Sequence, residues 1–260
     1  MMRKSVLAVA VAAAVAVPGL ASAQATAPAS PHTVAGNMGV FSDYRFRGIS
    51  QTFEQPAIQG GIDYSHSSGF YLGNWNSNVS GLSYPDGGGI EMDIYGGYKF
   101  GAGPVTLDVG LLQYYYPGAK YANGDKFDTT EAYFGVAWKW LTAKYSITTG
   151  DYFGLTSATS ASCTGADSKN SGYLDVSASY EIMPKLTLVG HLGNQTIKDC
   201  DPLEYSDWKV GVTYDVNGWL LGAAYIDTDA DETLYTLTSA GGKVKEIGKG
   251  TVVFSVSKSF

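Results

Sequence analysis

Histidine, the side chain most often used as a general base, is scarce in this chain. The chain contains three histidines, His32, His66 and His191, and of these His191 alone falls well inside an alternating segment. No serine-based motif stands beside it, and a serine nucleophile needs a base within hydrogen-bond reach. A single histidine on a strand is more simply a polar lining residue. We therefore expect no catalytic residues and no enzyme activity, with a lipid hydrolase as the weaker alternative.

One acidic segment resembles the start of a calcium-binding loop. Carboxylates alternate in the sequence DTDADE at residues 227–232. Loops of the EF-hand type need glycine at the sixth position and a closing glutamate at the twelfth, whereas this chain has Glu232 and Thr238 there. We expect a solvated acidic loop, no metal site and no cofactor.

Two cysteines, Cys163 and Cys200, are the only thiols of the chain. In an exported protein two cysteines favour a disulfide, and no spacing here is typical of a metal site. The alternative is a pair of unrelated buried thiols.

The N-terminus has the order of parts found in a secretory signal peptide. A basic start with Arg3 and Lys4 precedes an apolar run at residues 6–17, and a small-x-small site ends at Ala23. The run is too short for a membrane-spanning helix, which needs roughly 20 residues. We expect cleavage after Ala23, with residues 24–32 as a flexible leader.

Charge excludes one large class of function. The net charge is −7, and removing Arg3 and Lys4 makes it −9. Nucleic-acid binding requires a basic footprint, so we expect no nucleic-acid partner. No apolar run after the signal peptide is long enough for a transmembrane helix.

Period-2 alternation of apolar and polar residues runs along most of the remaining chain. Residues 208–216 are an example, because Trp208, Val210, Val212, Tyr214 and Val216 are separated by Lys, Gly, Thr and Asp. Such alternation is typical of strands with one apolar face. About 12 strand segments are predicted, at residues 34–48, 56–66, 70–79, 90–98, 104–115, 131–140, 141–152, 174–182, 185–197, 208–216, 218–228 and 251–260.

Short and long connections alternate strictly between these segments. Tight links such as Asn217-Gly218 favour two-residue hairpins, whereas links such as 153–171 and 229–248 are long. Outer-membrane barrels have short periplasmic turns and long outer loops. We therefore predict an all-β transmembrane up-and-down antiparallel β-barrel over residues 33–260. Cys163 and Cys200 then fall in adjacent outer loops, at 153–171 and 198–206.

The chain ends on an aromatic residue at the end of its last strand. Phe260 resembles the terminal assembly signal of outer-membrane barrels, which implies periplasmic chaperones and the barrel-assembly machinery as partners. Outer-membrane lipid and lipopolysaccharide are the expected surroundings, and the bacterial outer membrane of Gram-negative bacteria is the expected location.

A family resemblance is carried by the segment SDYRFRGISQT at residues 42–52, followed by PAIQGGIDY at 56–64 and GFYLG at 69–73. These residues resemble the N-terminal segment of the TorF-type family of outer-membrane porins. The resemblance covers residues 42–75 closely and the rest of the chain loosely. It implies an outer-membrane barrel with a porin-like role, and it supplies no substrate and no catalytic residue.

Charged side chains of inward parity are the candidate pore lining. We expect a porin for passive diffusion of small hydrophilic solutes, mildly cation-favouring, with Arg45 and Arg47 near a constriction because rings of charge set selectivity. The alternatives are a lumen plugged by a self-paired salt network and a non-conducting structural or ligand-binding barrel. The candidates are nine acids, Asp43, Asp63, Glu91, Asp93, Asp108, Glu131, Asp175, Glu181 and Asp215, and six bases, Arg45, Arg47, Lys99, Lys139, Lys144 and Lys209.

Overall fold

The structure is a computed structural model that describes residues 30–260. The predicted signal peptide, residues 1–23, lies outside the described residues, as does most of the predicted leader. Within residues 30–260, no helix is long and apolar enough to cross a membrane.

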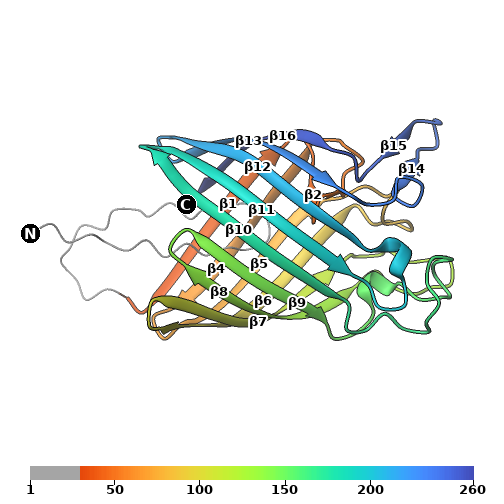
Figure 1. The fold of residues 1–260 in the computed structure, drawn as a ribbon, viewed down its shortest axis with the longest axis horizontal. Helices are drawn as coiled ribbons and strands as arrows, with labels where there is room; N and C mark the ends of the chain where they lie inside the picture. Colours follow the sequence, from red (N-terminus) through yellow and green to blue (C-terminus); the bar gives the residue numbers. More distant parts are fainter. Residues whose placement is uncertain (1–29) are drawn as a thin grey trace, which may run out of the picture.

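Twelve strands form one closed antiparallel barrel (Figure 1). Each strand pairs with its neighbours along the chain, and the first strand closes the barrel by pairing with the last. The predicted up-and-down barrel of about 12 strands is therefore confirmed. Its strands are β1 (His32–Phe41), β4 (Ala57–His66), β5 (Phe70–Asn78), β6 (Ile90–Ala102), β7 (Val105–Tyr115), β8 (Thr129–Trp138), β9 (Leu141–Thr148), β10 (Gly172–Met183), β11 (Leu186–Thr196), β12 (Tyr205–Val216), β13 (Trp219–Thr228) and β16 (Thr251–Ser259).

Short elements lie in the connections between these strands. Two of them form a small hairpin between β1 and β4, and two others form a hairpin between β13 and β16. They are β2 (Arg45–Phe46), β3 (Ile49–Ser50), β14 (Thr236–Thr238) and β15 (Val244–Glu246), together with the 3-10 turns η1 (Tyr152–Gly154) and η2 (Asp201–Leu203).

The closing contact of the barrel involves its last residue. Asn37 of β1 lies opposite Ser259 of β16, and the N–H of Phe260 donates to the carbonyl oxygen of Gly36 at 2.8 Å. Because the first and last strands pair, the barrel leaves no free strand edge. The Phe260 side chain lies on the outside and is 67% exposed, and its role as an assembly signal stays a prediction.

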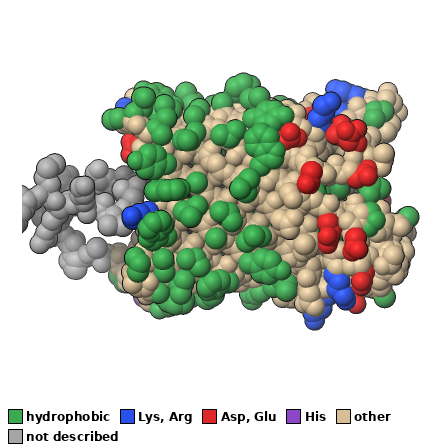
Figure 2. Space-filling view, in the orientation of Figure 1, with side chains coloured by type: hydrophobic (Ala, Val, Ile, Leu, Met, Phe, Trp, Pro, Cys, Tyr) green, Lys and Arg blue, Asp and Glu red, His purple; other side chains and the backbone are tan. Residues whose placement is uncertain are grey.

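Alternation along the strands sorts side chains between the outside and the interior. On β12, Trp208, Val210, Val212, Tyr214 and Val216 are all exposed on the outer surface. Figure 2 shows the same pattern over the barrel, with apolar side chains across the wall and charged side chains gathered at one end. An exposed apolar surface of this extent is what a barrel in lipid presents.

The two ends of the barrel differ in the length of their connections. Five tight turns and both ends of the described chain lie at one end, here called the turn end, and six longer connections lie at the other, the loop end (Figure 1). In the turn after β12, Asn217 and Gly218 have positive φ values of 54° and 85°, as type I′ turns require. The loops span residues 42–56, 79–89, 116–128, 149–171, 197–204 and 229–250.

Among the strand boundaries that differ from those predicted, two move candidate lining residues off a strand of the barrel. β1 ends at Phe41, whereas alternation predicted a strand continuing to residue 48. Lys139, predicted on a strand, lies in the turn between β8 and β9 with a φ of 54°.

The predicted disulfide is present. Cys163 in loop 149–171 and Cys200 in loop 197–204 form a disulfide across a sequence separation of 37 residues. Both cysteines are buried in the hydrophobic cluster at the loop end. The bond therefore ties two neighbouring loops to the packed interior.

Replacing both cysteines by serine should lower the free energy of unfolding by roughly 2–4 kcal/mol, because the unfolded loops regain their freedom. Urea titration of the refolded protein in micelles, followed by tryptophan fluorescence, measures this change. An unchanged midpoint and slope would show that the bond contributes nothing to stability. A barrel with native gel mobility before heating serves as the control for folding.

Candidate functional site

The interior of the barrel is packed at the loop end and looser toward the turn end. Inward side chains near the loop end are almost fully buried, among them Ser77, Glu91, Glu131 and Gln195, which are at most 2% exposed. Farther along the same wall, inward residues such as Lys209 and Thr213 of β12 are only partly buried. The interior is therefore filled at one end and hollow at the other.

The filling comes from loop 42–56, which folds into the barrel instead of extending outward. Asp43, Arg45 and Arg47 all lie on this loop, so their predicted place on the wall of the first strand is wrong. Their side chains are nevertheless in the interior, because the hairpin β2–β3 carries them there. We call residues 42–56 the plug loop.

Asp43 organises the base of the plug loop. Its carboxylate accepts from Arg45 Nε at 2.6 Å, from Ser50 Oγ at 2.6 Å and from Thr52 Oγ1 at 3.0 Å. Arg45 also donates through Nη1 to the carbonyl oxygens of Ile247 at 2.9 Å and Lys249 at 3.0 Å. These bonds fix the plug loop to loop 229–250.

Arg47 stands at the tip of the hairpin and reaches the barrel wall. Its Nη2 lies 2.7 Å from both carboxylate oxygens of Glu131 on β8, and its Nη1 donates to Gln195 Oε1 on β11 at 2.7 Å. The guanidinium also lies 4.2 Å from the ring centroid of Tyr173 on β10. A charge-assisted contact of this kind is both strong and directional. The tip is therefore fixed to two separate strands.

Aromatic side chains fill the space around the plug loop. Tyr44 and Tyr116 donate to the two oxygens of Glu91 at 2.6 and 2.7 Å. Phe46 packs edge-on against Tyr114 and Phe153, with ring centroids 5.4 and 5.8 Å away. These contacts leave the plug loop surrounded by side chains from four strands and loops.

Tyr84, in loop 79–89, closes the packing from the outside. Its hydroxyl donates to Gln51 of the plug loop, and its ring stacks on Tyr116. Burial, followed by the nearby Glu91 carboxylate, raises the pKa of Tyr84 well above its usual value. The phenol therefore stays protonated and keeps its role as a donor.

Beyond the plug loop, the wall formed by β4 to β8 is filled by tyrosines. Tyr95 donates to Asp63, and Tyr71 donates to Asp108 at 2.6 Å. Tyr71 lies over Gly97, where an added Cβ would come within 2.6 Å of the tyrosine hydroxyl oxygen. Glycine on one strand thus makes room for the ring from the next.

A cavity of about 240 Å³ lies beside the opposite wall, formed by β9 to β13 and β16. Inward positions there carry small side chains, such as Ser179, Gly222, Ala224 and Ser255, where the other wall has tyrosines. The plug loop bounds the cavity at one end, through Asp43 to Gly48, and turn residues Lys139 and Trp140 line it at the other.

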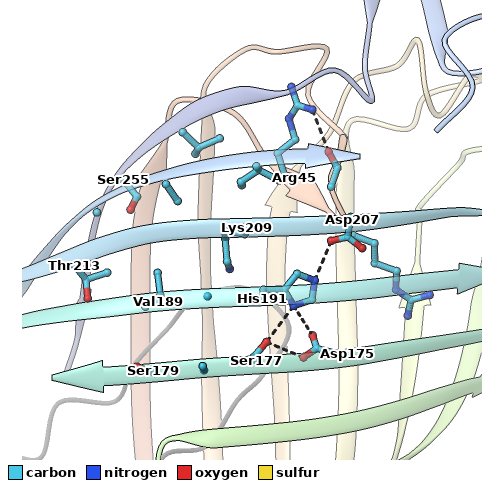
Figure 3. A pocket seen from close by; sticks show the side chains of 18 of the residues that line it. Arg45, Asp175, Ser177, Ser179, Val189, His191, Asp207, Lys209, Thr213 and Ser255 are labelled. Carbon is cyan, nitrogen blue, oxygen red and sulfur yellow. Dashed lines mark hydrogen bonds and ion pairs between the residues drawn. The ribbon is translucent and has the colours of Figure 1, made fainter. Parts of the chain in front are cut away.

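A hydrogen-bonded cluster centred on His191 lines this cavity (Figure 3). His191 Nε2 lies 2.9 Å from Asp207 and Nδ1 lies 3.4 Å from Asp175. Tyr173 donates to the second oxygen of Asp207 at 2.7 Å. The imidazole on β11 therefore bridges two carboxylates, one on each of the flanking strands β10 and β12.

Ser177 brings this cluster close to the composition of a hydrolytic triad. Its Oγ lies 3.1 Å from Nδ1 of His191, and Asp207 contacts the other nitrogen. However, Ser177 Oγ lies closer to Asp175, at 2.7 Å, and a carboxylate is the stronger acceptor for its single proton. The serine is thus directed away from the base that a nucleophile needs.

Residues 30–260 contain no group of three or more His, Cys, Asp or Glu side chains placed to hold a metal ion. In the acidic segment 227–232, Asp231 accepts from the backbone and hydroxyl of Thr233, and Asp229 accepts from the N–H of Ser206. These carboxylates serve the local loop structure.

The structure divides the predicted lining residues into three groups. Those at the cavity are Asp43, Arg45, Arg47, Lys139, Lys144, Asp175 and Lys209. Those packed among aromatic residues or on the β4–β8 wall are Asp63, Glu91, Asp93, Lys99, Asp108 and Glu131. Glu181 and Asp215 lie near the turns, where they accept from the N–H groups of Lys185 and Gly218.

Some functional candidates were not predicted from the sequence. Asp207 shares the inward parity of Lys209 and was detectable in that way, whereas Gln195 and Tyr44 carry no charge that would single them out. Asp93 is 7% exposed, and its Oδ1 has no hydrogen-bond partner within the described residues.

Comparison with known proteins identifies a family and a fold. A family model described as "Bacterial protein of unknown function (Gcw_chp)" matches residues 25–260. No curated protein is similar to the chain. The resemblance in residues 42–75 is to TorF-type porins, whereas the family that matches is Gcw_chp.

Solved structures of porins and channels are among those similar to this chain. The NanC porin is 10% identical with a TM-score of 0.51, covering 88% of this chain and 99% of its own. The KdgM porin is 8% identical with a TM-score of 0.49, covering 88% and 98%. The COG4313 outer membrane channel from Pseudomonas putida F1 is 11% identical with a TM-score of 0.42, covering 90% and 97%. At these identities the likeness to NanC shows the fold alone.

The Arg47–Glu131 pair gives a direct test of how the plug loop is held. Arg47→Met or Glu131→Gln alone should lower the free energy of unfolding by about 3–5 kcal/mol, because each leaves a buried charge unpaired. The double variant should be more stable than either single variant. Urea unfolding in micelles measures all three, and a Glu131→Gln protein as stable as the unmodified chain would contradict the pairing.

Proposed function

The chain belongs to the Gcw_chp family of bacterial proteins of unknown function, and we propose that it is a gated outer-membrane channel for passive diffusion of small hydrophilic solutes. One observation carries this proposal. The cavity ends at the plug loop and not at a strand of the wall. Moving the loop would extend the cavity toward the loop end without breaking any of the strand pairs that close the barrel.

The outer surface supports a place in the outer membrane. Exposed apolar side chains cover the outside of the wall. Every strand of the barrel has two hydrogen-bonded neighbours, as a lipid environment requires. Lipid would then cover the apolar band, and lipopolysaccharide would meet the charged loop end seen in Figure 2. Export by a signal peptide, periplasmic chaperones and the barrel-assembly machinery are part of the same proposal.

The plug loop has features that favour a movable element. Arg47, Phe53 and Glu54 all adopt positive φ values, between 48° and 54°, which cost on the order of 1 kcal/mol each for residues other than glycine. The plug loop is held by contacts with side chains and with other loops. It forms no β-ladder with the strands of the barrel. Release of the loop would relieve this backbone strain and expose polar groups to water.

The ionic preference that we propose is based on the residues that line the cavity. It replaces the cation preference that was predicted by counting all inward-facing charges. Among the cavity-lining residues there are five bases and three acids. Of the remaining predicted acids, Glu181 and Asp215 lie near the turns, and the others lie among tyrosines or beside the plug loop, where Glu131 pairs with Arg47. A net positive lining favours anions in the diffusing solute.

A non-conducting barrel is the second candidate, and a specific observation favours it. Arg47 and Glu131 form a nearly fully buried pair, with side chains 6% and 2% exposed, which is a costly contact to open. In that case the plug loop would be a permanent filling and the cavity a binding site. Conductance separates the two functions.

Single-channel recording tests the gate. Replacing residues 45–50 by a Gly-Ser segment of equal length removes the hairpin and should raise the mean current at least tenfold, because the lumen loses its obstruction. The matched control replaces residues 157–162, in a loop outside the lumen, in the same way and should leave the current unchanged. The unmodified protein should open rarely and briefly.

Two results would contradict the proposal in different ways. Absence of current above background from all three proteins would reject the channel. Equal, steady currents from all three would reject the gate and keep the channel.

Substitutions on one strand test the membrane-facing surface. Val210→Arg places a charge on the outer face and should lower the free energy of unfolding in vesicles by roughly 2–4 kcal/mol, the cost of an arginine near the bilayer midplane. Thr213→Arg on the same strand faces the cavity and should cost far less. Folding yield at increasing urea measures both, and equal costs would contradict the assignment of the two faces.

A further inference from the structure

The wall beside the cavity carries two rows of polar side chains at matched positions. In the row nearer the plug loop, Lys144 of β9 lies opposite Asp175 of β10. In the next row, Ser177 of β10 lies opposite His191 of β11, which lies opposite Lys209 of β12. The two lysines thus flank the His191 cluster from its two sides.

The carboxylates of this cluster are already occupied. Asp175 accepts from Ser177 and contacts His191, while Asp207 contacts His191 and accepts from Tyr173. Each of their four oxygens therefore has a partner within the cluster. Their hydrogen bonding therefore does not require either lysine.

Neither lysine forms an ion pair with a carboxylate of residues 30–260. Among the described residues, no carboxylate lies within 4.0 Å of the ammonium group of Lys144 or Lys209. Both side chains line the cavity, and both are partly buried. The arginines at the other end are engaged, since Arg45 binds Asp43 and Arg47 binds Glu131. The lysines are thus the available cationic groups of the inner cavity.

Their separation suits an anion with more than one charged group. β9 and β12 are three strand spacings apart, which places the two backbones about 14 Å from each other. Lys144 Nζ lies 5.5 Å from the ring centroid of Tyr133 on β8, which is on the side of β9 away from β12. Hydroxyl groups of Thr142, Thr213 and Ser255 line the same cavity and offer hydrogen bonds to a polar ligand.

We infer that this cavity is a binding site for small organic dianions, with Lys144 and Lys209 each contacting one anionic group. The shared chemistry is that of a dicarboxylate or a phosphate monoester. The His191 cluster acts as a positioning element, because it holds Asp175 and Asp207 away from the lysines.

This inference deepens the proposed function but does not require conduction for its test. Calorimetry on the folded protein in micelles would use succinate and glycerol phosphate as probes, with succinamide as the uncharged counterpart of succinate. We expect one probe class or both to bind, and succinamide to bind at least about tenfold more weakly, a difference of about 1.4 kcal/mol.

Lysine variants identify the contacts. Lys144→Met combined with Lys209→Met should weaken binding by at least tenfold, whereas Lys144→Arg combined with Lys209→Arg should retain most of it. The matched control is Lys258→Met, because that side chain lies over Trp219 on the outer surface and should leave binding unchanged.

The outcomes leave no ambiguous case. Binding of neither anion to the unmodified protein, equal binding of succinamide, or full binding by the double methionine variant would each overturn the inference. If that variant does not fold, the salt dependence of the unmodified protein decides, because binding through two ammonium groups must weaken as ionic strength rises. Anion binding without any current would reject the channel alone and keep the site.

Discussion

The closure of the backbone hydrogen-bond network is the constraint on which the rest of this structure depends. Twelve strands complete one another's N–H and C=O groups only because β1 pairs with both β4 and β16. An open edge in hydrocarbon would leave polar groups without partners, at several kcal/mol each. Closure also fixes which side chains face outward, since a shift of one residue in register would exchange the two faces of a strand.

Within the closed wall, side-chain size decides where the barrel is hollow. Strands β4 to β8 carry tyrosines that lie over glycines and bind carboxylates, and they fill their half of the interior. Strands β10 to β13 and β16 carry serine, glycine and alanine at equivalent positions, and the cavity lies there. The plug loop then divides the cavity from the packed loop end. Charge is sorted in the same way, with acids held by tyrosines on one side and unpaired lysines on the other.

The sequence predicted the barrel well because its evidence is local. Alternation in residues 208–216, the Asn217-Gly218 turn and the placement of the two cysteines each follow from the residues in one short segment. The plug loop was not predictable by the same means. The alternation of β1 continues through Asp43, Arg45 and Arg47 because the hairpin β2–β3 is itself extended, and periodicity cannot distinguish a strand of the wall from a hairpin inside it.

The charge balance of the cavity could not be predicted from the sequence, for a related reason. Parity shows that a side chain faces inward, but it carries no information on depth or on partners. Glu91 and Glu131 were therefore counted as lining residues, although Tyr44, Tyr116 and Arg47 bury them. Those partners lie 47, 25 and 84 residues away in the chain. Only the three-dimensional arrangement brings them together.

The position of the plug loop also sets the order in which the molecule can be built. The loop belongs to the first connection of the chain, yet Arg47 binds Gln195, 148 residues later, and Arg45 binds Lys249, 204 residues later. None of these partners is in place until the late strands have paired, and contacts so distant in sequence form slowly. The loop can therefore complete its contacts only after β11 and loop 229–250 have taken their places.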